Sequence, residues 1–357
     1  MNGLESRSFQ WNPAKAGFFV VAVLVLSGCA TPQVSQLARD FPISTKGDSG
    51  IAALGASGAS TQPSSALPST LPISASIPGV PFFPQDDFQC GPAALAMVAQ
   101  HAGVKVLPDE LTEQVYVPGR KGSFQVEMLT ATRRQALVAY TLQPQLEDLL
   151  REVASGNPVL VFQNLSLQVY PIWHYAVVIG FDRARNTVVL HSGVTERLEM
   201  SLFTLERTWA RGEHWSMVAL PPERLPATAQ AERFAAAAAG LERVQPAAAQ
   251  VAYRTALKAW PGQRAAMIGL GNAAYALGQQ EEAAARFESA TREHADFADA
   301  WNNLAQVRLE QGRLPEAADA IKRAVQIGGP RAERYSSLQE KILAKLKAPA
   351  SASAQRP

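Results

Sequence analysis

The sequence predicts an α+β domain followed by an all-α repeat domain. Between residues 77 and 222, segments typical of helices come first and segments typical of strands follow, which is an α+β order. After Pro221-Pro222 the composition becomes rich in alanine and helical in character. From there on, small and apolar residues recur 34 positions apart. A chain of 357 residues, 47% of them hydrophobic, is long enough to bury the cores of two domains.

Residues 1–29 are predicted to be a lipoprotein signal peptide. Positive charges precede a short apolar run between residues 17 and 26. The run leads into Leu26-Ser27-Gly28-Cys29, which matches the bacterial lipobox and predicts lipidation of Cys29. An ordinary secretory signal with an unrelated cysteine is the alternative. By resemblance to enterobacterial sorting rules, Ala30 in place of an aspartate favours a lipid anchor in the outer membrane, facing the periplasm.

Residues 30–76 are predicted to be a disordered tether, because Gly, Ala, Ser, Thr and Pro dominate them. Residues 348–357 are predicted to be a disordered tail. The chain has two cysteines, so lipidation of Cys29 would leave Cys90 as the sole thiol. A lone thiol in an oxidising compartment is exposed to oxidation, and nucleophilic chemistry would give a reason for its presence.

The segment around Cys90 predicts a thiol at the start of a helix. Gly91 permits a tight turn, Pro92 suits the first helical turn, and an apolar run follows. Unpaired backbone N–H groups and the helix dipole at that position favour the thiolate. Gln85 can supply an amide donor, and His174 begins an apolar strand downstream. Together these are the parts of a thiol acyl-transfer site, whereas a buried structural cysteine is the simpler alternative.

A family resemblance rests on Gln85, Cys90-Gly91-Pro92, Leu95, and His174-Tyr175 with Val177-Val178 and Gly180. These residues resemble the papain-like cysteine peptidases that remove double-glycine leaders from bacteriocins, and more closely their stand-alone bacterial relatives. The resemblance covers residues 77–222 and implies a papain-like α+β fold acting on a peptide or protein. It implies that Cys90 is the nucleophile, His174 the base and Gln85 the oxyanion donor, with Gln89 as the lesser candidate for that donor.

The group that orients His174 departs from this family pattern. Family members usually have Asp-Pro at the end of the next strand, but here that strand ends in His191-Ser192-Gly193. We expect His191 to orient His174 as a neutral hydrogen-bond acceptor. Asp182 is the alternative, and loss of full catalytic power is a third.

The second domain, residues 229–347, is predicted to consist of tetratricopeptide repeats with a capping helix over residues 331–346. The 34-residue period is typical of this repeat, and an alanine-rich bundle is the alternative. Such arrays bind proteins, so a protein partner is expected. The matching positions are Leu270 and Leu304, Gly278 and Gly312, Ala283 and Ala317, Phe287 and Ile321, and Ala290 and Ala324.

Several classes of function are disfavoured by the sequence. A net charge of +2 argues against nucleic acid as a partner. The five histidines lack metal-ligand spacing, so neither a metal nor a cofactor is expected. The predicted function is a membrane-anchored periplasmic cysteine peptidase with a protein-binding repeat domain, and both hydrolysis and acyl transfer fit it. The alternative is a non-catalytic peptide-binding or assembly lipoprotein.

Overall fold

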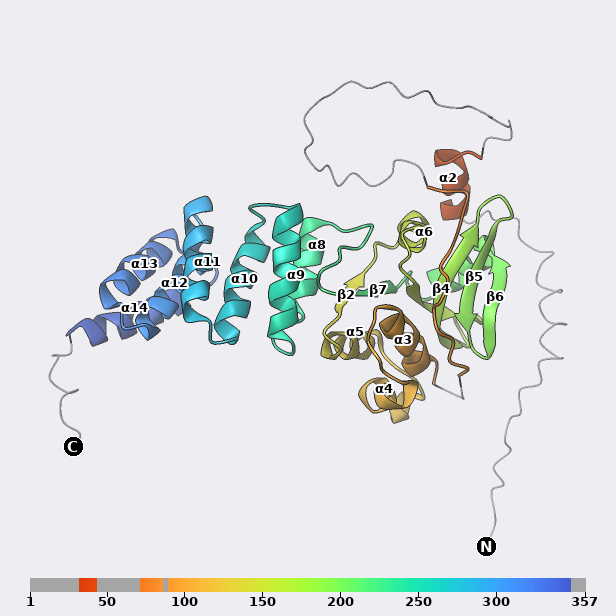
Figure 1. Ribbon diagram of the computed structural model, residues 1–357, viewed down its shortest axis with the longest axis horizontal. Coiled ribbons are helices and arrows are strands. Elements are labelled where there is room, and N and C mark those ends of the chain that lie inside the picture. Colours follow the sequence, from red (N-terminus) through yellow and green to blue (C-terminus); the bar gives the residue numbers. More distant parts are fainter. Residues whose placement is uncertain (1–31, 44–70, 86–88, 348–357) are drawn as a thin grey trace, which may run out of the picture.

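The computed structural model describes residues 32–43, 71–85 and 89–347, which form a sheet domain and a row of helices extending from one side of it (Figure 1). The predicted signal peptide with Cys29 and the tail at 348–357 lie outside the described residues. Helices precede most of the strands in the first domain, and helices alone form the second. The predicted fold class, α+β followed by an all-α repeat array, is therefore confirmed.

The sheet has seven strands in the order β2-β7-β3-β4-β5-β6, with β1 paired to β4, and every pairing is antiparallel. Along β4, strand β3 pairs with residues 173–178, whereas β5 pairs only with residues 177–182. The start of β4 is therefore unpaired on its β5 side. The strands are β1 (Ser74–Ser76), β2 (Val138–Thr141), β3 (Val159–Asn164), β4 (Trp173–Asp182), β5 (Thr187–Ser192), β6 (Thr195–Ser201) and β7 (Ser216–Leu220).

Helix α3 (Cys90–His101) is the buried helix of this domain, and it packs against β3, β4 and β7. Every residue from 91 to 99 is buried, because the sequence places small and apolar side chains on all faces of the helix. In the described ranges, no helix combines the length and the apolar character that crossing a membrane requires. The other helices here are α4 (Pro108–Val115), the 3-10 helix η1 (Pro118–Arg120), α5 (Gln125–Arg134), α6 (Leu146–Ala154) and α7 (Leu202–Ala210).

Both ends of the predicted tether are folded, so the prediction of disorder over 30–76 is wrong there. Helix α2 (Pro32–Asp40) lies against α6 and α7, and β1 joins the sheet. Val34 and Leu37 are buried, and the N–H groups of Gln33 and Val34 each donate to a carboxylate oxygen of Glu206 at 3.0 Å. A distant buried carboxylate thus caps this helix, a contact that local composition could not indicate.

The repeat domain consists of three helix pairs and a final helix, which confirms the predicted repeats. Gly278 and Gly312 adopt a φ of 73°, a backbone conformation that favours glycine, in the turns between paired helices. Ala283, Phe287 and Ala290 are buried between helices, as the repeat spacing predicts. The helices are α8 (Ala231–Ala239), α9 (Pro246–Ala259), α10 (Arg264–Ala276), α11 (Gln280–Glu293), α12 (Ala298–Glu310), α13 (Leu314–Ile327) and α14 (Ala332–Lys347).

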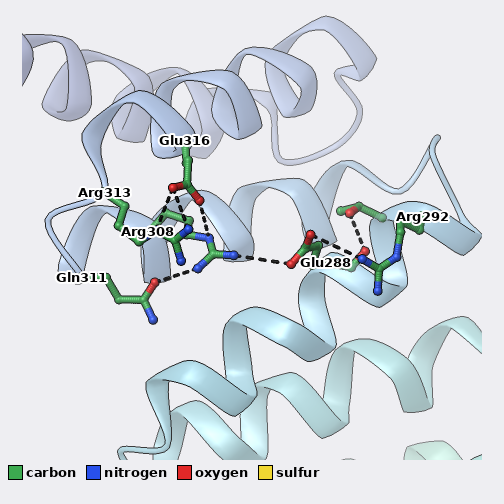
Figure 2. A network of polar contacts seen from close by, with 7 residues as sticks. Glu288, Arg292, Arg308, Gln311, Arg313 and Glu316 are labelled. Atoms are coloured by element: carbon green, nitrogen blue, oxygen red, sulfur yellow. Dashed lines mark hydrogen bonds and ion pairs between the residues drawn. The ribbon is translucent and has the colours of Figure 1, made fainter.

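A polar network joins the last two repeats. The Arg308 side chain is 12% exposed and lies 3.4 Å from a Glu288 oxygen and 3.2 Å from a Glu316 oxygen. It also donates to Oε1 of Gln311 at 3.0 Å. Figure 2 shows that one guanidinium in this way links side chains of α11, α12 and α13. Such a network stabilises more than an isolated surface ion pair, because one ordered side chain serves several partners.

The junction between the two domains is packed. One hydrophobic core runs from the sheet domain through Phe234 of α8 and on to Ala273 of α10. Glu152 of α6 is fully buried, and its carboxylate accepts hydrogen bonds from the N–H groups of Ala227 and Thr228 at 3.1 and 2.8 Å. The predicted boundary between residues 222 and 229 is therefore a fixed connection that holds the repeats in one orientation.

Candidate active site

Cys90 is the first residue of α3, where the N–H groups of the first helical turn lack intrahelical partners. Its sulfur also accepts from the N–H of Tyr175, the peptide group that follows His174. The sheet makes this donor available. Phe162 of β3 pairs with Tyr175, but its N–H donates to the Trp215 carbonyl on the other side of β3. Phe162 and Tyr175 therefore form a non-hydrogen-bonded pair, and the Tyr175 N–H points away from β3. The open edge of β4 therefore receives Cys90.

Burial opposes ionisation of both Cys90 and His174. It raises the pKa of the Cys90 thiol above its ordinary value, and the N–H groups of Tyr175 and Gly91 beside the sulfur only partly offset the rise. Burial lowers the pKa of His174 to about 4. At neutral pH the thiol and the imidazole are therefore both uncharged. Burial thus opposes the thiolate that the helix start was expected to favour, because desolvation of the sulfur outweighs the backbone N–H groups beside it.

His174 has a hydroxyl partner. Its Nε2 lies 2.9 Å from Oγ of Ser192, the last residue of β5. The register explains the pairing. His191 pairs with Val177 on the neighbouring strand. Because side chains alternate along a strand, the next residue, Ser192, projects from the other face of the sheet, which is the face that also carries His174. Ser192 therefore lies at the end of β5, where the family pattern described above has an orienting carboxylate and where His191 was expected to act.

His191 does not contact His174, so the expected orienting contact is wrong. The buried His191 ring bonds backbone groups instead, with Nε2 3.2 Å from the Val80 carbonyl oxygen and Nδ1 accepting the Arg197 N–H at 3.2 Å. Asp182 is no substitute. It lies eight positions along β4 from His174, about 25 Å away in an extended strand, and it accepts the Arg185 N–H at 3.0 Å.

Gln85 brings a spare amide donor to the site. Within the described part of the chain, its Nε2 is buried and has no hydrogen-bond partner. Its backbone N–H donates to the Gly193 carbonyl at 3.2 Å, which holds the residue beside the turn after β5. The Oε1 of the lesser candidate, Gln89, accepts from the Thr112 hydroxyl at 2.9 Å, which holds that side chain against α4. The geometry thus favours Gln85 over Gln89 as the donor.

Ser192 and Gly193 together position two of the predicted site residues. Ser192 meets the His174 ring through its side chain, and Gly193 meets the Gln85 backbone through its carbonyl. Sequence reasoning missed both residues. Alternation along β5 places Ser192 and His191 on opposite faces, but only the register of β5 against β4 decides which of the two meets His174.

Gly91 is required where it stands. A Cβ there would lie 2.7 Å from Cβ of Ser123 and closer still to Oγ, so any larger residue would displace the loop before α5. The Tyr175 hydroxyl donates to the Ser123 carbonyl at 3.2 Å and fixes that loop from the strand side. Among the described residues, no three His, Cys, Asp or Glu side chains gather in a way that could hold a metal ion.

The repeats carry a second candidate site on the side lined by α10, α12 and α14. It holds two adjoining cavities of about 790 and 480 Å³ that share Asn272, Tyr275, Asn303 and Arg334. Asn303 donates to Oδ1 of Asn272 at 3.0 Å and accepts from Asn302 at 3.1 Å, forming a row of amides. In the described chain, Oδ1 of the buried Asn302 lacks a partner. These two cavities, called the groove below, therefore present amide groups and the Arg334 cation to any polypeptide segment that binds there.

Solved structures similar to parts of the chain fall into two groups. A Bacillus anthracis protein described as C39-like is 18% identical, covers 41% of this chain and 97% of its own, and has a TM-score of 0.36. The peptidase domain of Streptococcus ComA, a bi-functional ABC transporter, is 18% identical over 40% of this chain and 99% of its own, with a TM-score of 0.34. The Yersinia enterocolitica type III secretion chaperone SycD, in complex with a peptide of the translocator YopD, is 20% identical over 32% of this chain and 94% of its own, with a TM-score of 0.30.

Sequence models of two families match successive parts of the chain. The Peptidase C39-like family matches residues 77–211, and the tetratricopeptide repeat matches residues 234–285 and 268–332. No curated protein matches the chain. The first match covers the residues from Gln85 to Ser192 that form the candidate active site, and the second covers most of the helical repeats. The chain thus joins a domain of the Peptidase C39-like family to a set of tetratricopeptide repeats.

Proposed function

We propose that this protein is a cysteine peptidase of the bacterial envelope, anchored in the outer membrane by lipid on Cys29 and facing the periplasm. The observation that carries the proposal is the convergence of three groups on the open edge of β4. Cys90 meets the peptide group after His174, His174 is held by Ser192, and Gln85 offers an unpartnered buried amide. An unsatisfied buried donor is costly, and an oxyanion that forms only during reaction would repay that cost.

The neutral resting site suggests how the reaction begins. The uncharged imidazole of His174 accepts the thiol proton as the Cys90 sulfur attacks the peptide carbonyl carbon. The carbonyl oxygen becomes an oxyanion and accepts hydrogen bonds from Gln85 Nε2 and from the Cys90 N–H. The imidazolium then protonates the leaving amine, the C–N bond breaks, and a thioester to Cys90 remains. Water, activated by His174, hydrolyses the thioester and restores the thiol; another amine in its place gives transfer.

Ser192 makes this site weaker than one with a carboxylate. Hydrogen bonds that involve an ionised partner are roughly twice as strong as neutral ones, so a hydroxyl stabilises the imidazolium less than an aspartate would. The low pKa of His174 has the same consequence. We therefore infer a slow peptidase that depends on its substrate to displace water and complete the electrostatics.

We propose that the repeats hold the substrate or a partner as an extended acidic segment. Arg264 and Arg331 on the groove are neutralised by Asp296 and Asp299, at 2.9 and 2.6 Å. Arg334 and Lys341 also line the groove, and no ion pair engages them within the described residues. Their charges favour carboxylates on the bound segment, and the amide row suits its backbone.

A substrate-like electrophile tests the catalytic proposal. A peptidyl acyloxymethyl ketone should label Cys90 in the wild type, and Cys90→Ala and His174→Ala should prevent labelling. Simple alkylation is less informative, because the raised thiol pKa slows it in a catalytic site as well. Comparing cleaved peptides in envelope extracts of wild type and Cys90→Ala would then identify substrates.

The second candidate function is peptide binding without catalysis. The uncharged Cys90–His174 site and the missing carboxylate favour it. It predicts that the ketone leaves Cys90 unlabelled, while Cys90→Ala still co-purifies with the same envelope proteins as the wild type.

A further inference from the structure

We propose that the β3–β4 loop, residues 165–172 with Trp173, is a membrane-contacting element that lies on an anionic bilayer beside the lipid anchor. The loop also leads directly into His174, so the same contact would set the active site at the membrane surface. The role of the anchor rests on the proposed lipidation of Cys29, whereas the loop itself does not depend on it.

The loop displays apolar side chains without any charge. Its sequence from Leu165 to Trp173 contains no Asp, Glu, Lys or Arg. Val169 and Tyr170 at its tip are 75% and 78% exposed. Contiguous exposed apolar patches on a folded protein mark interaction sites, and tyrosine and tryptophan are the residues enriched at membrane–water interfaces. The exposed apolar residues are Leu165, Leu167, Val169, Tyr170, Ile172 and Trp173.

The loop is held in this exposed position from its base. Asn164 is buried, and its Oδ1 accepts the N–H groups of Ser166 and Ile172, both at 3.0 Å. The N–H of Leu165 donates to the carbonyl of Ile172 at 2.9 Å, closing the base. Trp173 stacks on Phe162 with ring centroids 5.1 Å apart. A fixed base spares the loop much of the ordering entropy that binding otherwise costs.

The start of α2 adjoins the base of this loop through the turn at residues 211–214. On one side of the turn, Nε2 of Gln33 lies 3.4 Å from Nε2 of His214. On the other side, Nε of Arg211 donates to the Asn164 carbonyl at 3.1 Å. A Cβ on Gly212 would approach the carbonyl carbon of Phe162 to 2.9 Å, so the turn lies directly on β3. One small turn therefore separates α2 from the loop.

This placement limits how far the loop can stand from a lipid on Cys29. Cys29 precedes Pro32, the first residue of α2, by three positions. Three residues span at most about 10 Å even when fully extended. An acyl chain on Cys29 would therefore bring the start of α2, and with it the base of the loop, close to the bilayer surface.

Two arginines and one exposed acid, Glu213, are found at this end of α7 and in the turn that follows, so the positive charges outnumber the negative one. Arg207 is exposed on the last turn of α7, and Arg211 follows that turn and bonds the Asn164 carbonyl. Burial lowers the Arg211 pKa, and the nearby positive charge of Arg207 lowers it further, so the two guanidinium groups are close together. Paired cations beside a protruding apolar loop suit a bilayer whose headgroups carry negative charge, since the loop enters the interface while the cations meet phosphates.

The experiment measures partition onto vesicles of phosphatidylethanolamine and phosphatidylglycerol, using the full mature chain with Cys29→Ser so that no lipid contributes. The double substitution Val169→Ser with Tyr170→Ser should lower the partition coefficient by about tenfold or more, because two apolar side chains lose their transfer energy. The matched control is Ile73→Ser, an exposed apolar residue that receives the Arg183 N–H at the far end of β4. Its partition should equal that of the parent.

Each other outcome overturns the proposal. Absence of vesicle binding by the parent protein, or equal binding by the loop variant, removes the membrane role. Unchanged binding together with a raised KM for a soluble peptide assigns the loop to substrate binding instead. Repeating the partition measurement with Cys90→Ala separates this inference from the proposed catalysis, since vesicle binding should be the same with or without the thiol.

Discussion

The hydroxyl oxygen of Ser192 lies 2.9 Å from Nε2 of His174, so the candidate base is oriented by a neutral group at the end of the neighbouring strand. A hydroxyl fixes the ring without supplying a charge. On the proposed function, proton transfer from Cys90 would therefore begin between two uncharged groups, and the stability of the imidazolium would depend on what the substrate brings to the site.

Ser192→Ala should lower kcat by about fivefold, the effect of one lost neutral hydrogen bond, and leave KM unchanged because Ser192 positions only His174. Ser192→Asp should raise the His174 pKa and increase kcat, because a carboxylate stabilises the imidazolium. Steady-state kinetics as a function of pH measure both. Unaltered pH profiles in both variants would contradict the positioning role.

The pH dependence should reflect the low pKa of His174. With that pKa at about 4, the base stays unprotonated and kcat/KM should hold until the pH falls toward 4, well below the ordinary histidine value of 6.5. The lowered His174 pKa also makes the folding stability depend on pH. The contribution of His174 to the free energy of unfolding is present above pH 6.5, where the histidine is also neutral in the unfolded chain, and is lost as the pH falls through about 4. Urea unfolding of wild type and His174→Gln at several pH values measures it, and parallel curves would contradict it.

Gln85→Ala should reduce kcat by about 100- to 1,000-fold if its amide holds the oxyanion. Gln89→Ala is the matched control, since the amide oxygen of Gln89 accepts from the Thr112 hydroxyl on α4 and the residue has no role in the proposed mechanism. Its kcat should stay close to that of the wild type. The reverse pattern would transfer the oxyanion role to Gln89.

Glu152→Ala should destabilise the whole chain by about 3 kcal/mol or more, because several buried donors at the junction lose a charged acceptor together. Glu152→Gln is the conservative control and should cost less. A chain truncated after Pro226 should also lose stability, since it removes Thr228 and Phe234 and exposes the part of the sheet-domain core that they cover. Thermal unfolding measures all three, and an unaffected truncation would show that the domains are independent.

Cys29→Ser should move the protein from the membrane to the soluble fraction and abolish labelling with palmitate. Two or more acyl chains anchor a protein firmly, whereas the membrane contact proposed for the loop would by itself be weak. Fractionation and metabolic labelling check this. An unlabelled wild type with the same distribution as Cys29→Ser would remove the lipid anchor from the proposal.

Local signals sufficed for part of this molecule. The glycine and proline after Cys90 marked a helix start, and the 34-residue spacing marked the repeats. The partner of His174 was not visible locally, because it depends on the register of β5 against β4, including an irregularity between Val178 and Gly180. The fold of α2 was hidden for a similar reason. Its cap, Glu206, lies more than 170 residues away, and no composition reveals that contact.

Ionisation could not be predicted from the sequence for a different reason. A helix start lowers a thiol pKa whereas desolvation raises it, and the surroundings of Cys90 and His174 remove water from both side chains. Burial of this kind arises from the whole fold, so a motif alone predicts the wrong direction for the shift of the thiol pKa.

The packed junction has a consequence for selectivity. Glu152 and the shared core fix the first repeat helices to the sheet domain, so the groove around Arg334 is attached to the domain of Cys90 through packed helices and not through a flexible linker. A polypeptide gripped in that groove would reach the thiol only if enough residues separate its docking motif from the bond to be cut. On the proposed function, substrates would then be selected by the number of residues between the docking motif and the cleaved bond, as well as by their sequence.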